Sequence, residues 1–304
     1  MILIITHKLD YTADFLINIL NNKNISYKRL NCEDIDQEYC RFSFKGHFSY
    51  SILGESNFKS VWFRRTMLPD LTGLSDHEKV YLLNDYDSLL KNLFSVIDGK
   101  WLSEPFAVYK AENKLFQLKH AIRLGFTVPQ TLITNSKKEL SEFYNLMDKE
   151  VIIKPITHAK ISNGKNSTFI YTSRIDQKLI DNLSEFDLTP CIYQKNIHKD
   201  YEIRVTVVGE NVFPSAVYSQ SDKETLQDWR RKKLAFFKVD IPDAISSMCV
   251  NLVKEMNLSF GAIDLIKTVN GEYVFLEINP NGQWAWIENQ TGMPIANSLI
   301  DYLV

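Results

Sequence analysis

The segment GAIDLIKTVNGEYVFLEINPNGQW at 261–284 constrains the fold of this chain more than any other. Apolar and polar residues alternate on both sides of Asn270-Gly271. This dipeptide is typical of two-residue hairpin loops, because a type I′ turn needs positive φ at both central positions. The segment therefore predicts two antiparallel strands joined by a tight turn. Antiparallel hairpins mixed with helices elsewhere indicate an α+β fold rather than a doubly wound parallel sheet.

The predicted hairpin brings acidic side chains together. With a two-residue loop, Asp264 lies directly opposite Glu277, and Asn279 points to the same face. Like charges in opposed positions are unfavourable, since their Cβ atoms are only about 5 Å apart. Carboxylate and amide oxygens suit Mg²⁺, which commonly joins one or two carboxylates to nucleotide phosphates. These residues predict a metal site; on the hairpin alone, two screened, solvent-facing carboxylates are the alternative.

The first hundred residues predict a small α/β domain that ends near the segment WLSEP. Ser75 and Glu78 have the spacing of a capping box, which marks the start of a helix. The elements expected from hydrophobic periodicity are strands at 1–6, 25–30 and 61–63, a hairpin around Gly46 and a helix over 75–97.

The rest of the chain predicts two further units that mix helices with antiparallel strands. Helical spacing after Tyr109 stops at Gly125, a residue favoured just after helix ends. The apolar strand CIYQK opens the last unit, which closes with the hairpin. The predicted organisation is an α/β domain at 1–105, a central unit at 106–190 and a carboxyl-terminal unit at 191–304.

Composition excludes several classes of protein. The chain has 35 Lys and Arg against 37 Asp and Glu, so it offers no overall field for nucleic acid or an anionic membrane. Its start lacks the pattern of a signal peptide, and no window approaches the ~18 apolar residues of a membrane span. The four cysteines are scattered without C-x-x-C spacing, which favours reduced thiols and a cytoplasmic protein.

Several segments suggest a binding cleft. Lys154 ends a strand expected to be buried, and lysine is seldom buried without a partner. It either extends to the surface or meets an anion such as a phosphate. The loop at 157–167, which contains Lys160, has a composition suited to covering phosphates, or that of an ordinary surface loop. The connector at 191–197 is either a plain strand or a place where adenine is held between units.

Taken in order, these features resemble the ATP-grasp superfamily, whose members join a carboxylate to a nucleophile through an acyl phosphate. The resemblance runs from about 105 to 290 and implies three subdomains, with the nucleotide between the central and carboxyl-terminal ones. It implies ATP and Mg²⁺ as cofactors. It assigns the nucleotide to Lys114, Lys154, Lys160, Gln194, Lys195 and Ile197, and the magnesium to Asp264, Glu277 and Asn279.

Within this superfamily the chain resembles the maturases of peptides with ω-ester and ω-amide rings, the graspetides of the microviridin type. The Gln-Trp-x-Trp run that follows the predicted metal ligands is the most specific feature. The loop at 157–167 departs from the superfamily pattern, because Gly164 is its only glycine. The segments that carry the likeness are VWFRR at 61–65, GFTVPQTLITN at 125–135, YEIRVTVVG at 201–209, DWRRKK at 228–233 and EINPNGQWAWIE at 277–288.

This resemblance implies a ligase that acts on a ribosomally made precursor peptide with a leader and an acidic core. An Asp or Glu side chain of the core attacks the γ-phosphate of ATP, while magnesium and lysines offset charge on the phosphates. A Ser or Thr hydroxyl then closes an ester ring, or a Lys amine closes an amide ring. The resemblance also implies a homodimer.

The likeness also suggests catalytic residues. Arg204, in the segment EIRV, is expected to stabilise the acyl phosphate and the tetrahedral oxyanion. The alternative is an ion pair with Glu202 on the same strand face. Asp228 and Arg230 are expected beside the acceptor peptide, where Arg230 and Arg231 would pair with its acidic core. A solvated loop or a nucleic-acid patch is the alternative for this basic run.

Arg64 and Arg65 are two further candidates for contact with the peptide. They either face the same cleft or form a surface pair at the end of a strand. A net-acidic chain with one basic cluster makes nucleic acid the poorer partner for either group.

Two rival functions remain open at this point. A ligase that adds free amino acids to a protein terminus, like the ribosomal-protein glutamate ligases, shares the lysines and the metal ligands. A nucleotide-binding module without catalysis is the second rival. The presence of both lysines, the arginine and all three metal ligands argues against a purely binding role.

Overall fold

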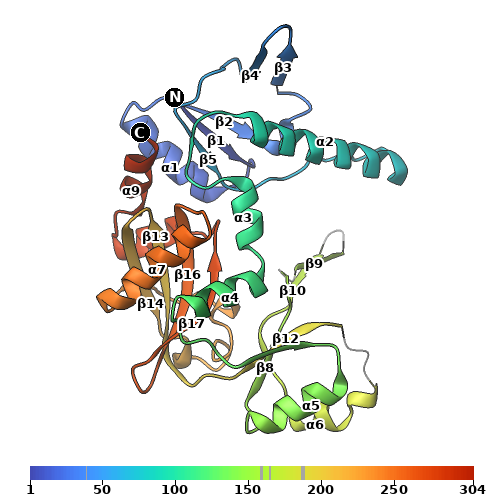
Figure 1. Ribbon diagram of the computed structural model, residues 1–304, viewed down its shortest axis with the longest axis vertical. Coiled ribbons are helices and arrows are strands. Elements are labelled where there is room, and N and C mark those ends of the chain that lie inside the picture. Colours follow the sequence, from blue (N-terminus) through green and yellow to red (C-terminus); the bar gives the residue numbers. More distant parts are fainter. Residues whose placement is uncertain (39, 158–159, 164–165, 186–188) are drawn as a thin grey trace.

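The computed structural model describes the backbone of residues 1–38, 40–157, 160–163, 166–185 and 189–304, and their side chains except those of 160–163, 166–169 and 185. In this part of the chain the strands form three sheets of four or five strands and two separate hairpins. Figure 1 shows an elongated molecule with one sheet at one end and two sheets at the other. The predicted α+β class is confirmed.

The amino-terminal sheet is parallel, with the strand order β2-β1-β5-β6. β1 is apolar throughout and all five of its residues are buried, as expected for a strand covered on both faces. Ser75 and Glu78 form the predicted capping box. The elements are β1 Ile2–Thr6, α1 Tyr11–Asn22, β2 Tyr27–Asn31, the hairpin β3 Cys40–Phe44 and β4 Phe48–Ile52, β5 Ser60–Phe63, α2 Asp76–Val96 and β6 Lys100–Trp101.

The central sheet is antiparallel, with the order β11-β8-β12-β7. Two helices pack against it through a small apolar cluster that includes Leu140 and Tyr144. The elements are β7 Thr131–Thr134, α5 Lys137–Leu146, β8 Val151–Lys154, the hairpin β9 Lys160–Asn163 and β10 Asn166–Phe169, β11 Ser173–Arg174, α6 Gln177–Asp181 and β12 Cys191–Lys195.

The carboxyl-terminal sheet is antiparallel and has the order β15-β14-β13-β16-β17. Helices α3 and α4 precede the central sheet in sequence, yet α4 packs against β17 of this sheet. The elements are α3 Pro105–Ala111, α4 Lys114–Arg123, β13 Lys199–Val208, β14 Asn211–Val217, β15 Phe237–Lys238, α7 Asp243–Glu255, β16 Phe260–Thr268, β17 Tyr273–Asn279, α8 Ala285–Thr291 and α9 Ile295–Leu303. Short 3₁₀ turns lie at Cys32–Asp34, Leu183–Glu185, Ser219–Ser221 and Trp229–Arg231.

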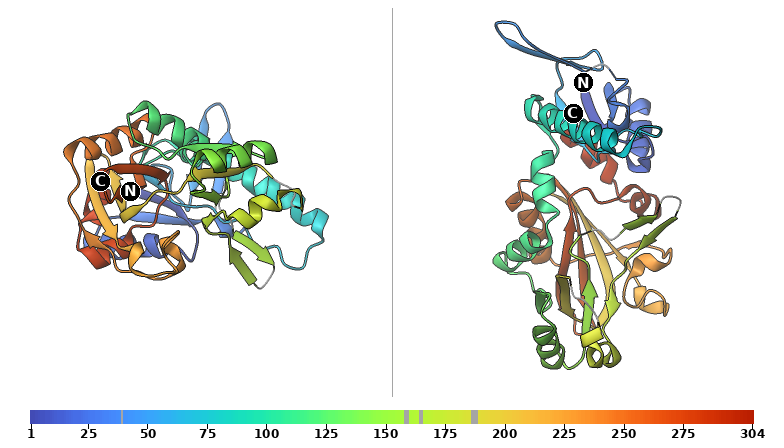
Figure 2. Two further views of the ribbon diagram at one scale, coloured as in Figure 1. Left: turned by 90° about the horizontal axis from the view of Figure 1, so that it is seen from below. Right: turned by 90° about the vertical axis from the view of Figure 1, so that its right-hand side faces the viewer.

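The last two helices return to the amino-terminal sheet. Leu16 and Leu20 of α1 share an apolar cluster with Trp284, Ile287 and Leu299. The two chain ends therefore lie at the same end of the molecule, as Figure 1 and the right-hand view of Figure 2 show. The division at 105 and 190 stays a prediction.

The carboxyl-terminal hairpin differs from the prediction in its turn. Thr268 pairs with Glu272, so the loop has three residues, and among these Gly271 takes the positive φ of 86°. The longer loop shifts the register by one residue, and a β-bulge next to Leu276 shifts it back. Asp264 pairs with Glu277, as predicted, because these two changes cancel.

The structure can be compared with two expectations drawn from the sequence, reduced thiols and the lack of a membrane-spanning segment. All four cysteines are free, and burial raises the pKa of Cys32 and of Cys249 to about 12, so both thiols stay protonated at neutral pH. Within the described ranges, we find no helix with the length and hydrophobicity needed to cross a membrane.

Candidate active site

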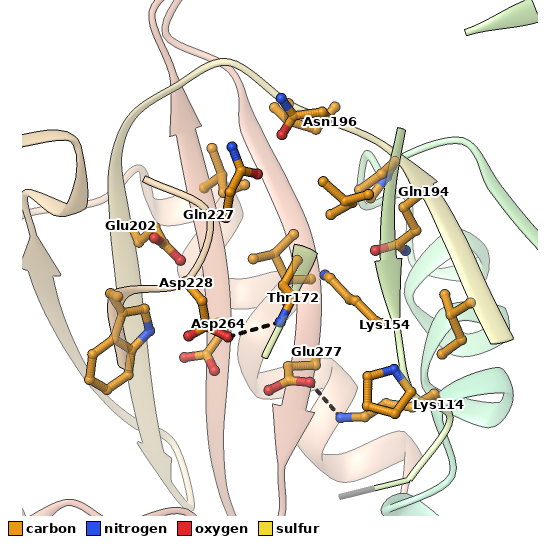
Figure 3. Close-up of a pocket in the computed structure, with 18 of the residues that line it drawn as sticks. Lys114, Lys154, Thr172, Gln194, Asn196, Glu202, Gln227, Asp228, Asp264 and Glu277 are labelled. Atoms are coloured by element: carbon orange, nitrogen blue, oxygen red, sulfur yellow. Dashed lines mark hydrogen bonds and ion pairs between the residues drawn. The ribbon is translucent and has the colours of Figure 1, made fainter. Parts of the chain in front are cut away.

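A cleft between the central and carboxyl-terminal sheets gathers most of the predicted site residues. It includes a cavity of about 140 Å³. In Figure 3, Lys114 and Lys154 extend into it from one side, and Glu277 and Asp264 face them from the other. The predicted residues that line it are Lys114, Lys154, Gln194, Lys195, Ile197, Asp228, Arg230, Asp264 and Glu277.

The three predicted metal ligands converge. Asn279 lies between the two carboxylates, and its Nδ2 donates to Asp264 Oδ2 at 3.2 Å and to Glu277 Oε1 at 3.3 Å. Their neighbours Ile263 and Ile278 are fully buried on the opposite face. The alternation of the strands thus puts all three side chains on one face, with Asp264 and Glu277 lining the cleft, and carboxylate and amide oxygens are ligands that suit a hard divalent cation.

Basic residues compensate the carboxylates. Lys114 Nζ lies 2.5 Å from Glu277 Oε2. Burial would raise the pKa of Glu277, but the charges of Lys114, Lys154 and Arg230 outweigh it and hold that pKa well below its usual range. Glu277 is therefore ionised at neutral pH.

Lys154 extends into the cleft without a partner among the described residues. Among the described residues it forms no ion pair or hydrogen bond, and burial lowers its pKa, an effect that Glu277 opposes. A half-buried ammonium group without a counter-charge is stabilised by an anion such as a phosphate. The loop at 157–167 was predicted to cover phosphates and to contribute Lys160. The side chain of Lys160 lies outside the described residues, so this role of Lys160 stays a prediction.

Arg204 does not pair with Glu202, so that alternative is wrong. Its Nε and Nη2 donate to the two carboxylate oxygens of Asp264, both at 2.8 Å, and its guanidinium lies 5.5 Å from the ring centre of Trp229. Glu202 instead accepts a hydrogen bond from Lys199 at 2.7 Å. Two neighbouring strands place Arg204 directly opposite Asp264, a pairing that needs the tertiary register.

The connector at 191–197, whose first five residues form β12 of the central sheet, borders the cleft. The Gln194 side chain is buried and donates to Thr131 Oγ1 at 3.0 Å. Lys195 and Ile197 border the cavity together with Asn196. This stretch is the predicted adenine-binding connector, and its residues Gln194 and Asn196 lie in the upper right part of Figure 3.

A second cavity of about 780 Å³ adjoins the cleft. Lys114 and Arg230 line both spaces, so each residue faces the boundary between them. Asp228 is buried and holds Arg230 with hydrogen bonds of 2.8 and 2.6 Å. Burial would raise the pKa of Asp228, but its contacts with Arg230 lower it. Arg65 is exposed and borders the second cavity.

Segment 228–231 also reaches the central sheet. The Thr172 amide donates to Asp228 Oδ2 at 3.4 Å, a contact drawn in Figure 3. Arg231 Nη2 donates to the Thr172 carbonyl at 3.3 Å, and its guanidinium lies over the ring of Tyr171. Arg231 therefore joins the two sides of the cleft.

Arg64 is not a surface residue. Its side chain is 1% exposed, and its Nε lies 3.2 Å from Oδ2 of Asp10, which is also buried. Its Nη1 donates to the carbonyls of Asn281 and Gly282, in the turn that follows the metal ligands. The guanidinium is thus occupied by protein groups.

Sequence reasoning missed three residues of this region. Asp10 has a local signal, since it caps α1 at the end of the loop that follows β1. Gln117 lies one helical turn after Lys114 and is fully buried against β17. Thr172 follows the β9–β10 hairpin and carries no signal of its own in the sequence.

Comparison with known proteins identifies the class. The family model described as the RimK-like ATP-grasp domain matches residues 111–303, and the chain belongs to this family. The fold is the predicted ATP-grasp fold, and the chain is an ATP-grasp ligase by family.

Individual relatives refine this class. The structure is similar to a RiPP-associated ATP-grasp ligase of Chryseobacterium gregarium in complex with ADP and a leader and core peptide, with a TM-score of 0.90 and 26% identity over 99% of this chain and 96% of that one. The structure is also similar to the macrocyclase MdnC of Microcystis aeruginosa, bound to precursor peptide MdnA. The TM-score is 0.88, and the identity is 25% over 100% of this chain and 99% of MdnC. A probable alpha-L-glutamate ligase of Alkalilimnicola ehrlichii is 25% identical over 72% of this chain and 71% of the relative.

Proposed function

We propose that this protein is an ATP-dependent peptide maturase that activates Asp or Glu side chains of a ribosomally made precursor and closes ω-ester or ω-amide rings. The observation that carries the proposal is the likeness to peptide-bound ligases over essentially the whole chain. That likeness includes the first 110 residues, which lie outside the matched ATP-grasp domain. The amino-terminal part borders the second cavity, where a peptide would reach the activated phosphate.

The cleft residues fit ATP and Mg²⁺. Lys154, half-buried and without a partner among the described residues, would hold phosphate, and Asp264, Glu277 and Asn279 would hold the cation. Bound magnesium would neutralise charge on the phosphates during transfer. Lys114 stands between Glu277 and the boundary of the two cavities, where it would bind phosphate as well.

The second cavity would accept the core peptide. Its exposed arginines, Arg65 and Arg230, would pair with the acidic core, and Asp228 keeps the Arg230 guanidinium oriented. The peptide carboxylate would attack the γ-phosphate to form an acyl phosphate, with ADP as the leaving group. Arg230, at the boundary, and Arg204, beside Asp264, would stabilise the oxyanion as a hydroxyl or amine displaces phosphate.

The test is the intact mass of a candidate precursor peptide after incubation with the protein, ATP and Mg²⁺. The expected result is loss of one water for each ring, abolished by Glu277→Ala or Asp264→Ala. The control is Asp14→Ala, which removes a half-exposed carboxylate of the amino-terminal part, away from the cleft. A peptide that keeps its mass in the presence of an enzyme that binds ATP would sink the assignment for that precursor.

A second candidate is a ligase that adds free amino acids to a peptide or protein carboxylate. The likeness to probable alpha-L-glutamate ligases supports it, although this match covers less of the chain than the match to peptide-bound ligases. The same mass measurement separates the two, because ligation with added glutamate raises the product mass while ring closure lowers it.

We also infer that the protein works in the cytoplasm, as its scattered cysteines without C-x-x-C spacing suggest, and that it is a homodimer, as its resemblance to the peptide maturases implied. Light scattering coupled to size-exclusion chromatography tests the oligomeric state. A mass of one chain, 35.3 kDa, at micromolar concentration would contradict the dimer.

A further inference from the structure

Gln117 makes an unusual set of contacts for a helix side chain. It is 1% exposed, and its Nε2 donates to the Ala111 carbonyl at 2.7 Å and to the Ile278 carbonyl at 2.8 Å. Its Oε1 accepts from the Ile278 amide at 3.2 Å. One carboxamide therefore satisfies both backbone groups of Ile278.

The position of Ile278 gives these contacts their importance. β17 is the edge strand of its sheet, and alternate residues of an edge strand turn their N–H and C=O groups away from the sheet. Unpaired buried groups of this kind are costly, so a partner from α4 fixes the strand. Ile278 lies between Glu277 and Asn279, the two ligands that β17 contributes to the site.

The same helix carries Lys114. Lys114 and Gln117 are three residues apart, so they lie on one face of α4. Lys114 contacts the Glu277 carboxylate, while Gln117 holds the backbone next to it. The edge of β17 is thus held by α4 through one side-chain ion pair and two hydrogen bonds to the backbone of Ile278.

We propose that Gln117 is a positioning residue for the metal site. Its carboxamide fixes the backbone of Ile278 and thereby sets the direction and spacing of the Glu277 and Asn279 side chains. This inference rests on the proposed function, because it takes those two residues as ligands of Mg²⁺. Partners that orient metal ligands typically account for 10–100-fold of metal affinity.

The experiment measures how much Mg²⁺ strengthens the binding of ADP. Calorimetric titration of ADP with Mg²⁺ and with EDTA gives two affinities, and their ratio reports the metal site. We expect Gln117→Met, which keeps the length but has no hydrogen-bonding amide, to lower this ratio about 10–100-fold. Its affinity for ADP in EDTA should equal that of the wild type. A purely structural role would leave the ratio unchanged.

Ser60→Ala is the matched control. Ser60 is fully buried and donates to the Leu303 carbonyl at 2.6 Å, so this variant also loses a buried side-chain hydrogen bond, but away from the cleft. We expect it to lower stability and to keep the wild-type ratio. If circular dichroism shows Gln117→Met unfolded, Gln117→Glu is used, since it keeps the acceptor oxygen and loses the two N–H donors when ionised.

The outcomes separate the two proposals. In one outcome, Mg²⁺ strengthens ADP binding to the wild type, and the Gln117 variants have the same ratio of affinities. This outcome overturns the positioning role of Gln117 and leaves the metal site supported. A wild-type ratio of one overturns the metal assignment itself, and the positioning role with it. A reduced ratio in a folded Gln117 variant, with Ser60→Ala unchanged, supports the inference.

Discussion

Four carboxylates in and around the site each lie against a basic side chain. The pairs are Asp10 with Arg64, Asp228 with Arg230, Asp264 with Arg204 and Glu277 with Lys114. Buried charges are tolerated when they are paired and hydrogen-bonded, so each of these contacts compensates a charge that would otherwise be costly to bury. The sequence suggested that the basic residues face a ligand. The structure shows that four of them form ion pairs with carboxylates of the protein itself.

The first prediction concerns the buried pair of Asp10 and Arg64. Asp10→Asn should destabilise the protein by about 3–5 kcal/mol at neutral pH, because it leaves the Arg64 charge buried without its partner. The measurement is urea unfolding followed by circular dichroism. Asp14→Asn, which removes the half-exposed partner of Arg29, is the control and should cost less than about 1 kcal/mol.

The same pair predicts a dependence on pH. Burial would raise the pKa of Asp10, but Arg64 and the Thr6 hydroxyl lower it below the ordinary value. A carboxylate with a lowered pKa stabilises the fold above its unfolded pKa of about 3.9 and loses this contribution as the pH falls through the folded value. The difference between wild type and Asp10→Asn should therefore shrink below about pH 4, and a constant difference would contradict it.

The second prediction concerns Arg204. Arg204→Lys should raise the Mg²⁺ concentration needed for half-maximal activity about 10–100-fold, because one ammonium group cannot hold both Asp264 oxygens. Release of ADP at saturating peptide and varied Mg²⁺ measures this. Arg174→Lys, at an exposed ion pair with Glu150, should leave the Mg²⁺ requirement unchanged. An equal requirement in both variants would show that Arg204 does not orient Asp264.

At the scale of elements, the hairpin of β16 and β17 carries all three predicted metal ligands and sets their relative positions. The pairing of Asp264 with Glu277 was predicted correctly, but from a turn that is one residue too short. The bulge next to Leu276 restores the register, and Leu276 and Glu277 both line the cleft as a result. A bulge of this kind depends on how an edge strand packs against its neighbours, so the local sequence gives little sign of it.

The third prediction concerns the turn after β17. A Cβ at Gly282 would lie 2.4 Å from the Ala262 Cβ, too close for any side chain. Gly282→Ala should therefore lower stability by about 1–3 kcal/mol and reduce the Mg²⁺-dependent gain in ADP affinity, since the turn directly follows Asn279.

Gly271→Ala is the comparison for this variant. Gly271 has a φ of 86° and open space around its Cα, so alanine there should cost about 1–2 kcal/mol through backbone strain alone. The increase in ADP affinity that Mg²⁺ causes should be the same in Gly271→Ala as in the wild type. Thermal unfolding and calorimetry measure the two effects, and equal gains in both variants would contradict the coupling of Gly282 to the site.

At the scale of the whole molecule, the first and last parts of the chain pack against each other. The carboxyl-terminal helices pack against α1 and the amino-terminal sheet, so the first and last parts share one apolar cluster. Arg64 adds a polar link between the same parts through the carbonyls of Asn281 and Gly282. The site is thereby supported from both ends of the chain.

The fourth prediction follows from this packing. A chain that ends at Gly292 should not fold, because it lacks α9 and the buried residues Ile295, Leu299, Ile300 and Leu303. At 1.5–3 kcal/mol for each side chain, their burial amounts to about 6–12 kcal/mol, comparable to the whole stability of a typical domain. Circular dichroism and solubility measure the outcome. Removal of Val304 alone, a half-exposed residue, is the control and should have little effect.

The sequence by itself determined the local features: the strands and capped helices, the hairpin with two carboxylates, and the order of basic and acidic segments that resembles ATP-grasp ligases. These follow from short-range periodicity and turn chemistry, which act between residues near one another in the chain. Only the tertiary structure decided that Arg204 meets Asp264, that Gln117 holds Ile278 and that Arg64 is buried against Asp10. The physical reason is that each of these contacts joins residues more than fifty positions apart, whose distance depends on how sheets and helices pack.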